Sequence, residues 1–182
     1  MRVISGIARG KKLFSPTTKA TQPTMDRAKE TLFNMLESWR LSTGKGWGQI
    51  SFVDVFAGSG AIGIEAWSRG VKHPVFFEKD PNALKILNQN LKAVGLKEVA
   101  VQDALNPESG KPVSIIFMDA PYGKGLWAMA LQAFQKMGWI NQETLIIIET
   151  DVKNPEEIPQ EFSLIKSRNA GRNLFLFLKQ GE

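Results

Sequence analysis

The chain has 182 residues, of which 43% are hydrophobic, and a formal net charge of +5 at pH 7. This length and composition predict a single domain with a sizeable hydrophobic core. The sequence has no cysteine, no apolar run of transmembrane length and no basic start followed by an apolar core. Secretion and membrane insertion are therefore disfavoured, and a cytoplasmic protein is expected.

The positive charge is concentrated at the start of the chain. Residues 1–47 carry nine Lys and Arg against three Asp and Glu, whereas residues 48–182 carry fourteen against fifteen. A basic extension on a near-neutral body indicates an anionic partner, although a solubilising arm would have the same charge. We therefore divide one compact unit into a basic extension at residues 1–47 and a main domain at residues 48–182.

Two elements are predicted in the basic extension. Residues 2–14 alternate loosely around a glycine-containing centre, which favours a β-hairpin. Thr24 is a residue type that caps helices, and it precedes a helical pattern. The apolar residues of that pattern fall on one stripe: Ala28, Leu32, Phe33, Leu36 and Trp39. This stripe predicts a helix that packs against the core.

Strand-like and helix-like segments alternate through the main domain. Strands are predicted at residues 52–56, 74–78, 99–102, 113–118 and 145–149, and helices at residues 61–69, 81–94 and 126–137. This is the pattern of an α/β, doubly wound, mostly parallel sheet. Residues 162–167 and 174–179 have no helix between them and predict an antiparallel hairpin. We expect a Rossmann-like, seven-stranded sheet with one antiparallel strand.

A glycine-rich turn follows the first predicted strand in the sequence FVDVFAGSGAIG at residues 52–63. Gly58, Gly60 and Gly63 have the spacing G-x-G-x-x-G, which lets the backbone turn sharply into a helix and approach a ligand closely. This spacing indicates a nucleotide-type cofactor at the carboxyl end of the strand. A tight turn without a ligand would require glycine for the same steric reason.

Acidic residues lie in or after the predicted strands, where the carboxyl ends of parallel strands form one edge. Glu78 lies twenty residues after Gly58, where an acid that binds ribose hydroxyls is expected. Asp103 can accept a hydrogen bond from an adenine amino group, or can cap a loop. Asp54 lies inside a buried strand, and a cofactor with a cationic amino-acid end would compensate its charge.

The segment Asp119-Ala120-Pro121-Tyr122 follows the fourth predicted strand. Pro121 forces an extended conformation on Ala120, so the Ala120 carbonyl and the Asp119 carboxylate can both face the pocket, beside the Tyr122 ring. Two acceptors and a stacking face suit a planar base with an exocyclic amine. A simple proline-containing turn is the alternative.

Five sequence blocks together resemble a known family: ISGIARGKKL, QPTMDRAKETLFNML, VDVFAGSGAIGIEAWSRG, FFEKD and DAPYGKG. Across nearly its whole length the chain is similar to class I S-adenosylmethionine-dependent methyltransferases. Within that class it resembles the bacterial small-subunit ribosomal RNA (guanine-N2)-methyltransferases. The resemblance implies S-adenosyl-L-methionine as cofactor and no metal. It also implies 16S ribosomal RNA or the assembling small ribosomal subunit as partner, and a monomer.

The resemblance also implies roles for individual residues. The methionine end of the cofactor would contact Asp54, Phe56, Ala57, Gly58 and Gly60. The ribose would contact Glu78 and Lys79, the adenine would contact Asp103 and Ala104, and Asp119 would also reach the cofactor. The target base would contact Asp119, Ala120, Pro121 and Tyr122. Ala120 replaces the first proline of the usual family motif, which keeps the carbonyl acceptor but loosens the loop.

Two basic groups are candidates for binding RNA. The first is Arg2, Arg9, Lys11, Lys12, Lys19 and Arg27, and the second is Lys166, Arg168 and Arg172. If the first strand of the final hairpin runs parallel to the sheet, its turn emerges at the carboxyl edge beside Tyr122. The two groups would then flank the pocket and hold the RNA backbone while the pocket binds the base.

Three other functions remain open on the sequence. Adenine-N6 methyltransferases use a nearly identical tetrapeptide. A nicotinamide dehydrogenase shares the glycine spacing but is disfavoured by Asp54 and by the final hairpin. A non-catalytic RNA-binding or ribosome assembly protein would also have a basic extension. The single histidine, His73, precedes the second strand and is assigned no role.

Overall fold

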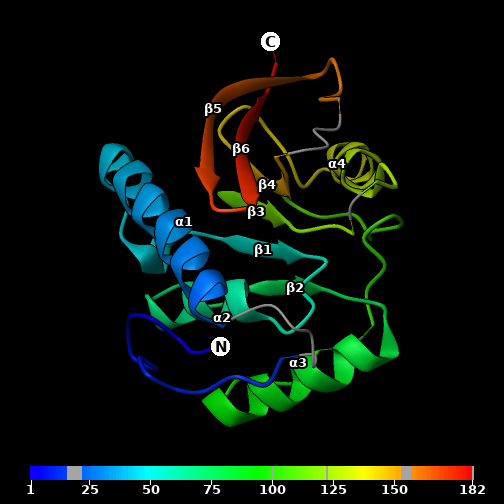
Figure 1. Cartoon of the computed structure of the whole chain (residues 1–182). Helices are drawn as coiled ribbons and strands as arrows, with labels where there is room; N and C mark the ends of the chain where they lie inside the picture. The colour runs from blue at the N-terminus through cyan, green and yellow to red at the C-terminus, as the bar shows by residue number, and fades with distance from the viewer. Residues whose placement is uncertain (16–21, 100, 122, 153–156, 182) are drawn as a thin grey trace.

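A six-stranded sheet forms the centre of the computed structural model, which describes residues 1–15, 22–99, 101–121, 123–152 and 157–181 (Figure 1). The strands are β1 (Phe52–Val55), β2 (Val75–Phe77), β3 (Ile115–Met118), β4 (Leu145–Asp151), β5 (Phe162–Ala170) and β6 (Asn173–Gln180). The helices are α1 (Gln22–Thr43), α2 (Ala61–Ser68), α3 (Pro81–Val94) and α4 (Leu126–Lys136), with a 3-10 turn at Trp47–Gln49. The strand order is β2-β1-β3-β4-β6-β5.

The first four strands in this order are parallel, so their carboxyl ends meet at one edge. Val53 pairs with Val75 in β2 and with Ile116 in β3, and Ile116 pairs with Ile146 in β4. β1 and β3 are buried along their whole length, as are the first residues of β4. Nearly continuous apolar runs are typical of parallel strands that are covered on both faces.

The final hairpin is confirmed, and it supplies the antiparallel strand. β6 runs antiparallel to both β4 and β5, so β5 points in the same direction as the parallel strands. Because Asp151 at the end of β4 pairs with Asn173, the β5–β6 turn emerges at the carboxyl edge. The first strand of the final hairpin therefore runs parallel to the sheet, as the predicted position of its turn requires. Tyr122, which is expected beside that turn, lies outside the described residues.

Helices cover both faces of the sheet. On one face, α1 contributes Leu32, Phe33 and Leu36 to a cluster with Phe117 and Phe175. On the other face, the α4 residues Trp127, Leu131 and Phe134 pack against the alternate residues of the same strands. α3 packs with α2 and residues 1–15 around Phe76, at the β2 end of the sheet. The described helices include none that is both long and apolar enough to cross a membrane.

Two predictions about local structure are wrong, and a third is met only in part. The described residues of segment 99–102 form no strand, and the segment is held to β2 by a 3.0 Å bond from the Gln102 N–H to the Glu78 carbonyl. The sheet therefore has six described strands instead of seven. Residues 2–14 form no regular strands, but their two arms pair in an antiparallel way, through a bridge between Arg2 and Lys12 and backbone hydrogen bonds from Val3 to Lys11 and from Leu13 to Met1. α1 begins at Gln22, so Thr24 lies inside the helix and is not its cap.

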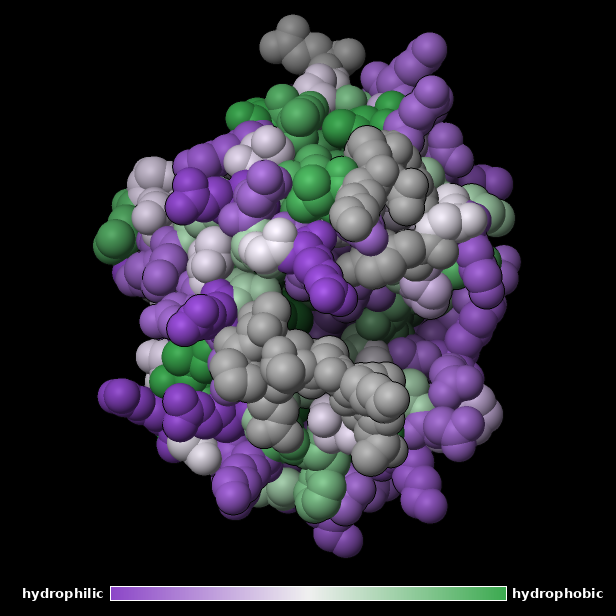
Figure 2. Space-filling view, viewed as in Figure 1, coloured by the Kyte–Doolittle hydropathy of each residue, from purple (hydrophilic) through white to green (hydrophobic). Residues whose placement is uncertain are grey.

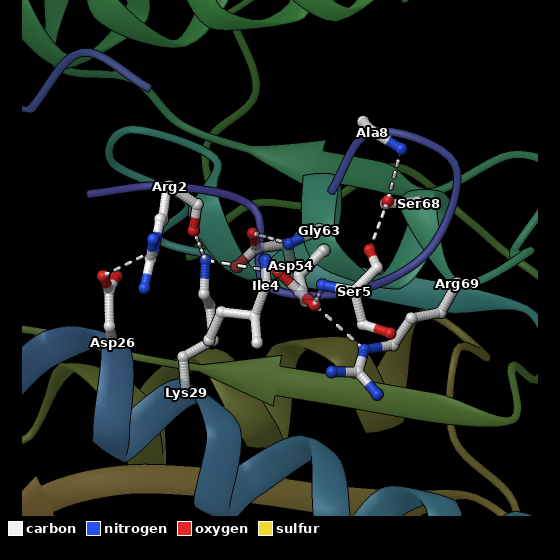
Figure 3. Close-up of polar contacts among 11 residues, drawn as sticks. Arg2, Ile4, Ser5, Ala8, Asp26, Lys29, Asp54, Gly63, Ser68 and Arg69 are labelled. Atoms are coloured by element: carbon white, nitrogen blue, oxygen red, sulfur yellow. Dashed lines mark hydrogen bonds and ion pairs between the residues drawn. The ribbon is translucent and has the colours of Figure 1, made fainter. Parts of the chain in front are cut away.

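A buried ion pair attaches residues 1–15 to the helices (Figure 3). The Lys29 ammonium in α1 lies 3.3 Å from Oε2 of Glu65 in α2, and the two side chains are 3% and 0% exposed. Lys29 Nζ also donates to the Arg2 carbonyl at 2.6 Å. Glu65 accepts hydrogen bonds from the backbone N–H groups of Ile4 and Ser5, at 2.8 and 3.0 Å. One carboxylate thus joins three segments of the chain.

Replacing Lys29 with methionine should destabilise the protein by about 2–3 kcal/mol, because the buried Glu65 carboxylate loses one of its two cationic partners and keeps Arg69, whose Nε lies 3.0 Å from Oε1. Urea unfolding followed by circular dichroism measures this loss. The control is Lys92→Met, at an exposed position of α3, which should stay within about 0.5 kcal/mol of the unmodified protein. Equal unfolding midpoints for the two variants would contradict the assigned role of the ion pair.

Candidate functional site

The turn after β1 has an unusual backbone conformation. Phe56, Gly58 and Gly60 have positive φ angles of 61°, 55° and 75°. A bulky residue such as Phe56 rarely adopts this conformation, and strained residues of this kind cluster at binding and catalytic sites. The N–H of Ala57 donates to the Phe77 carbonyl at 3.0 Å, which fixes the turn to the end of β2.

Gly60 is required by packing as well as by its backbone angle. It lies at the start of α2, and a Cβ atom at this position would lie 2.3 Å from Cδ1 of Leu87 in α3. Glycine therefore lets α2 begin directly after the turn while α3 packs against it. This approach fixes the position of the turn relative to the sheet edge.

Asp54 lies inside β1, 2% exposed, and points toward α2 (Figure 3). Its Oδ2 accepts a hydrogen bond of 2.8 Å from the Gly63 N–H. Desolvation by burial, together with the nearby charges of Asp119 and Glu78, raises the pKa of Asp54 to about 8, against the lowering effect of that hydrogen bond. A positively charged ligand group would favour the ionised form of this carboxyl.

Asp54 borders a cavity of about 160 Å³ at the carboxyl edge of the sheet. The ionisable side chains that line it are Asp54, Asp119, Glu149 and Lys29, Met1 also borders it, and the turn contributes Phe56, Ala57, Gly58 and Ser59. Phe117, Asn173 and Phe175 complete the wall on the β3 and β6 side. Figure 2 shows the molecule hollowed near the middle of the viewed face, with hydrophilic residues along part of the border.

Glu149 is a site residue that the sequence reasoning missed. It lies in β4 and accepts a hydrogen bond from the Asn173 side-chain amide of β6. Burial raises the pKa of Glu149 well above its ordinary value, and the charges of Asp119 and Asp54 add to this effect. A signal was present in the sequence, since Glu149 is the first acid after the apolar run 145–148, as Glu78 is after 75–77.

Glu78 supports the glycine turn directly. Its Oε2 accepts a hydrogen bond of 2.9 Å from the Gly58 N–H, and its Oε1 accepts from the N–H groups of Lys79 and Asp80, each at 2.8 Å. Glu78 thus lies against the turn, close to Asp54, as the sequence predicts. It does not line the 160 Å³ cavity, so it approaches the turn from another side.

Lys79, which directly follows Glu78 in the chain, joins Asp103 to the Glu78 segment. Lys79 Nζ is 3.1 Å from Asp103 Oδ1, and the Leu105 N–H donates to the same oxygen at 3.0 Å. The Leu105 hydrogen bond, with a smaller contribution from Lys79, lowers the pKa of Asp103. Ala104 is buried directly after it. The four residues expected near ribose and adenine therefore lie together, on segments that follow β2 and α3.

The candidate catalytic segment lies directly beyond β3. Asp119 is exposed and lines the cavity together with Asp54. The backbone N–H of Asp119 donates to the Val55 carbonyl at 3.4 Å. Ala120 is buried and Pro121 is exposed. Tyr122 lies outside the described residues, so its predicted stacking role stays a prediction. In the part of the chain that the structure describes, no cluster of three or more His, Cys, Asp or Glu residues could hold a metal ion.

The candidate RNA-binding residues are all on the surface where the structure describes them. Arg2, Arg9, Lys11, Lys12, Arg27, Lys166, Arg168 and Arg172 are exposed, and Lys19 lies outside the described residues. Arg2 has an internal partner, because its Nε lies 3.7 Å from Asp26 Oδ2. Arg168 and Arg172 lie at the β5–β6 turn, at the same edge of the sheet as the cavity.

Gly60→Ala should destabilise the protein by about 2–4 kcal/mol, since it combines an unfavourable positive φ with a clash against Leu87. Gly95→Ala is a matched control, because Gly95 also has a positive φ, of 85°, but a Cβ there would meet no atom within 4 Å. The control should lose only about 1–2 kcal/mol. Thermal unfolding of both variants measures the difference, and equal losses would show that packing at Gly60 is unimportant.

Known proteins are similar to this chain in sequence and in fold. A family model described as "Conserved hypothetical protein 95" matches residues 1–179. Ribosomal RNA small subunit methyltransferase D of Escherichia coli (strain K12) is 33% identical over 177 residues, which cover 94% of this chain and 86% of that protein. The Haemophilus influenzae protein of the same name is 32% identical over 179 residues, covering 94% and 89%. A solved Escherichia coli structure, provisionally described as a methyltransferase, aligns with a TM-score of 0.78 and 29% identity, over 99% of this chain and 97% of that one.

Proposed function

The chain belongs to the family described as Conserved hypothetical protein 95, and on that premise we propose that it methylates ribosomal RNA of the small subunit. Its methyl donor is S-adenosyl-L-methionine, and its target is the exocyclic N2 amine of a guanine in 16S ribosomal RNA. The carboxylates of Asp54, Asp119 and Glu149 around one cavity are the observation that carries this proposal.

The fit between the cavity and the cofactor is electrostatic. S-adenosylmethionine supplies a methyl group on a positively charged sulfur, and it also carries a cationic ammonium group. Three carboxylates against one lysine, with the raised pKa of Asp54, favour a ligand of positive charge. Asp54 and the turn from Phe56 to Gly60 would hold the methionine end.

Glu78 has capacity left for one ribose hydroxyl. An ionised carboxylate offers about four lone-pair positions, and the described hydrogen bonds from Gly58, Lys79 and Asp80 use three of them. The remaining position is on Oε2, beside the turn. Asp103, with Ala104, would contact the adenine, since Lys79 joins the Asp103 carboxylate to the Glu78 segment.

Asp119 and Ala120 would act on the target amine. The lone pair of guanine N2 is delocalised into the ring, so the amine must become more tetrahedral before it attacks the methyl group. The Asp119 carboxylate and the Ala120 carbonyl can accept its hydrogens and stabilise the positive charge that develops on nitrogen. Holding the amine in line with the methyl group and its leaving sulfur supplies much of the remaining rate.

In its ionised form Glu149 would favour guanine over adenine as the target, whereas the protonated form, which the raised pKa favours in the free protein, could donate to adenine N1. The Watson–Crick edge of guanine presents the N1–H and N2–H donors, which a carboxylate accepts, whereas adenine N1 is itself an acceptor. Glu149 lines the same cavity as Asp119, so one carboxylate can bind N1–H while the other faces the amine. The ionised form of Glu149 therefore disfavours the adenine-N6 alternative.

Tritium transfer from labelled cofactor to 16S ribosomal RNA of a deletion strain tests the reaction, and mapping the product identifies the nucleotide. Replacing the mapped guanine with inosine removes the N2 amine and should abolish transfer. Transfer to an adenine, or undiminished transfer to the inosine-containing RNA, would contradict N2 methylation. Absence of transfer with intact RNA binding would favour the non-catalytic alternative.

Asp119→Ala should lower single-turnover methylation by roughly 10²–10³-fold, because it removes one preorganised acceptor from the developing cation. Cofactor affinity, measured by calorimetry, should change far less. Methylation within a few-fold of the unmodified protein would show that Asp119 is not the acceptor for the amine.

Cofactor binding should release a proton near pH 7, because the free Asp54 carboxyl with a pKa of about 8 is mostly protonated at that pH. A cationic ligand beside it lowers the pKa, so the carboxyl ionises on binding, and affinity should increase as the pH rises toward 8. Calorimetry in two buffers with different ionisation enthalpies measures the released proton. Asp54→Asn should remove the pH dependence in this range. Its persistence in the variant would assign the proton to another group.

A further inference from the structure

A groove of about 540 Å³ separates α1 from the outer strands of the same sheet face. The α1 wall includes Asn34, Met35 and Trp39, and the opposite wall includes Lys166 and Arg168 of β5 with Phe177 of β6. The α1 residues that line the groove recur at intervals of three and four and so form one stripe next to the stripe that packs on the core: Thr31, Asn34, Met35, Ser38 and Trp39. Among the described residues that line the groove, none is acidic.

An irregularity in β5 places both cations in the groove. The β5–β6 register shifts between Leu164 and Lys166, where the ladder has a bulge. Beyond it, Lys166 pairs with Phe177 and Arg168 pairs with Phe175. Both phenylalanines belong to the cluster beneath α1, so the paired cations lie on the α1 face. Bulges re-aim side chains in this way.

The groove begins next to the catalytic cavity. Phe175 lines the cavity, and its cross-strand partner Arg168 lines the groove. Along α1, Lys29 lines the cavity, and Asn34 and Trp39 line the groove one to three turns farther on. If one unit of a polymer occupied the cavity, the neighbouring units of that polymer would therefore lie in the groove.

We propose that the groove between α1 and β5 binds a single-stranded RNA segment that adjoins the methylated guanine, an inference that rests on the proposed function. Unpaired bases lie against Trp39 and Met35, and Asn34 offers both a donor and an acceptor to a base edge. Lys166 and Arg168 bind the phosphates. An aromatic wall opposite a cationic wall is the arrangement that binds single strands, because duplex bases cannot reach the aromatic ring.

The charge-reversal variant Lys166→Glu/Arg168→Glu tests the cationic wall. Fluorescence anisotropy with a labelled single-stranded RNA of about 12 nucleotides measures binding over a range of salt concentrations. The variant should bind roughly tenfold more weakly, and the slope of log affinity against log salt should fall by about 1.4. Cofactor affinity, measured by calorimetry, should stay unchanged.

The control variant Lys111→Glu/Lys136→Glu makes the same change in net charge elsewhere. Both lysines are exposed near the end of α4, where the Gly110 N–H donates to the Met137 carbonyl, and α4 covers the opposite face of the sheet. This control should keep nearly the full affinity and most of the salt slope. Equal weakening by the two variants would show a general effect of net charge and overturn the proposal.

Trp39→Leu tests the aromatic wall while keeping an apolar side chain. Loss of one stacked base corresponds to roughly tenfold weaker RNA binding. A smaller loss of RNA affinity in the Trp39→Phe variant would identify stacking, because phenylalanine retains an aromatic ring. Equal thermal unfolding of the variants shows that the change is not a loss of folding. Unchanged affinity of a folded Trp39→Leu variant would overturn the stacking contact.

The binding and methylation readouts separate failure of this inference from failure of the proposed function. If the unmodified protein transfers no methyl group but its RNA binding depends on Lys166, Arg168 and Trp39, the groove is supported and the reaction is not. If methylation occurs while both groove variants bind RNA normally, the groove assignment is wrong. Loss of affinity for small-subunit particles but not for free RNA would assign the groove to a protein partner, which also overturns the proposal.

Discussion

The buried pair of Lys29 and Glu65 is the interaction on which the arrangement of this protein depends. Neither charge is stable alone in the core, and desolvation lowers the pKa of Lys29 even with Glu65 beside it. The same carboxylate accepts the backbone N–H groups of Ile4 and Ser5, so residues 1–15, α1 and α2 are fixed together. Through this pair, α1 is held where it borders both the cavity and the groove.

The carboxyl groups that line the cavity at the carboxyl edge of the sheet differ from Glu65, because among the described residues none of them has a cationic partner as close as Lys29 is to Glu65. Glu65 is compensated by Lys29, Arg69 and two backbone N–H groups, whereas Asp54 has, among the described residues, one hydrogen bond, from Gly63, and lies near two further acids. Such a cluster costs stability in the free protein, and a cationic ligand recovers part of that cost. An ion pair thus builds the scaffold, and buried carboxyl groups with raised pKa values mark the site.

The sequence predicts most of the sheet because burial on both faces leaves a clear apolar signal, as in β1, β3 and β4. The limits of α3 are also predictable, since Asp80 caps its start and Gly95 ends it. Segment 99–102 resembles a strand only in its valines, and its described residues are held by the Asn88 side chain of α3 and by a backbone bond to Glu78, directly after β2. The groove was missed because it depends on the bulge in β5, which local patterns do not reveal, whereas Glu149 follows an apolar run that the sequence does show.

The position of β5 at the end of the sheet has a consequence for solubility. An outermost strand presents backbone donors and acceptors to any other extended chain, and β5 also exposes Leu164 and Ile165, at 49% and 55%. The bulge and the charges of Lys166 and Arg168 oppose edge-to-edge association of two copies. Neutral residues at these two positions would leave an apolar edge that favours self-assembly. The need to keep the protein from aggregating therefore constrains the β5 sequence even where no nucleic acid is bound.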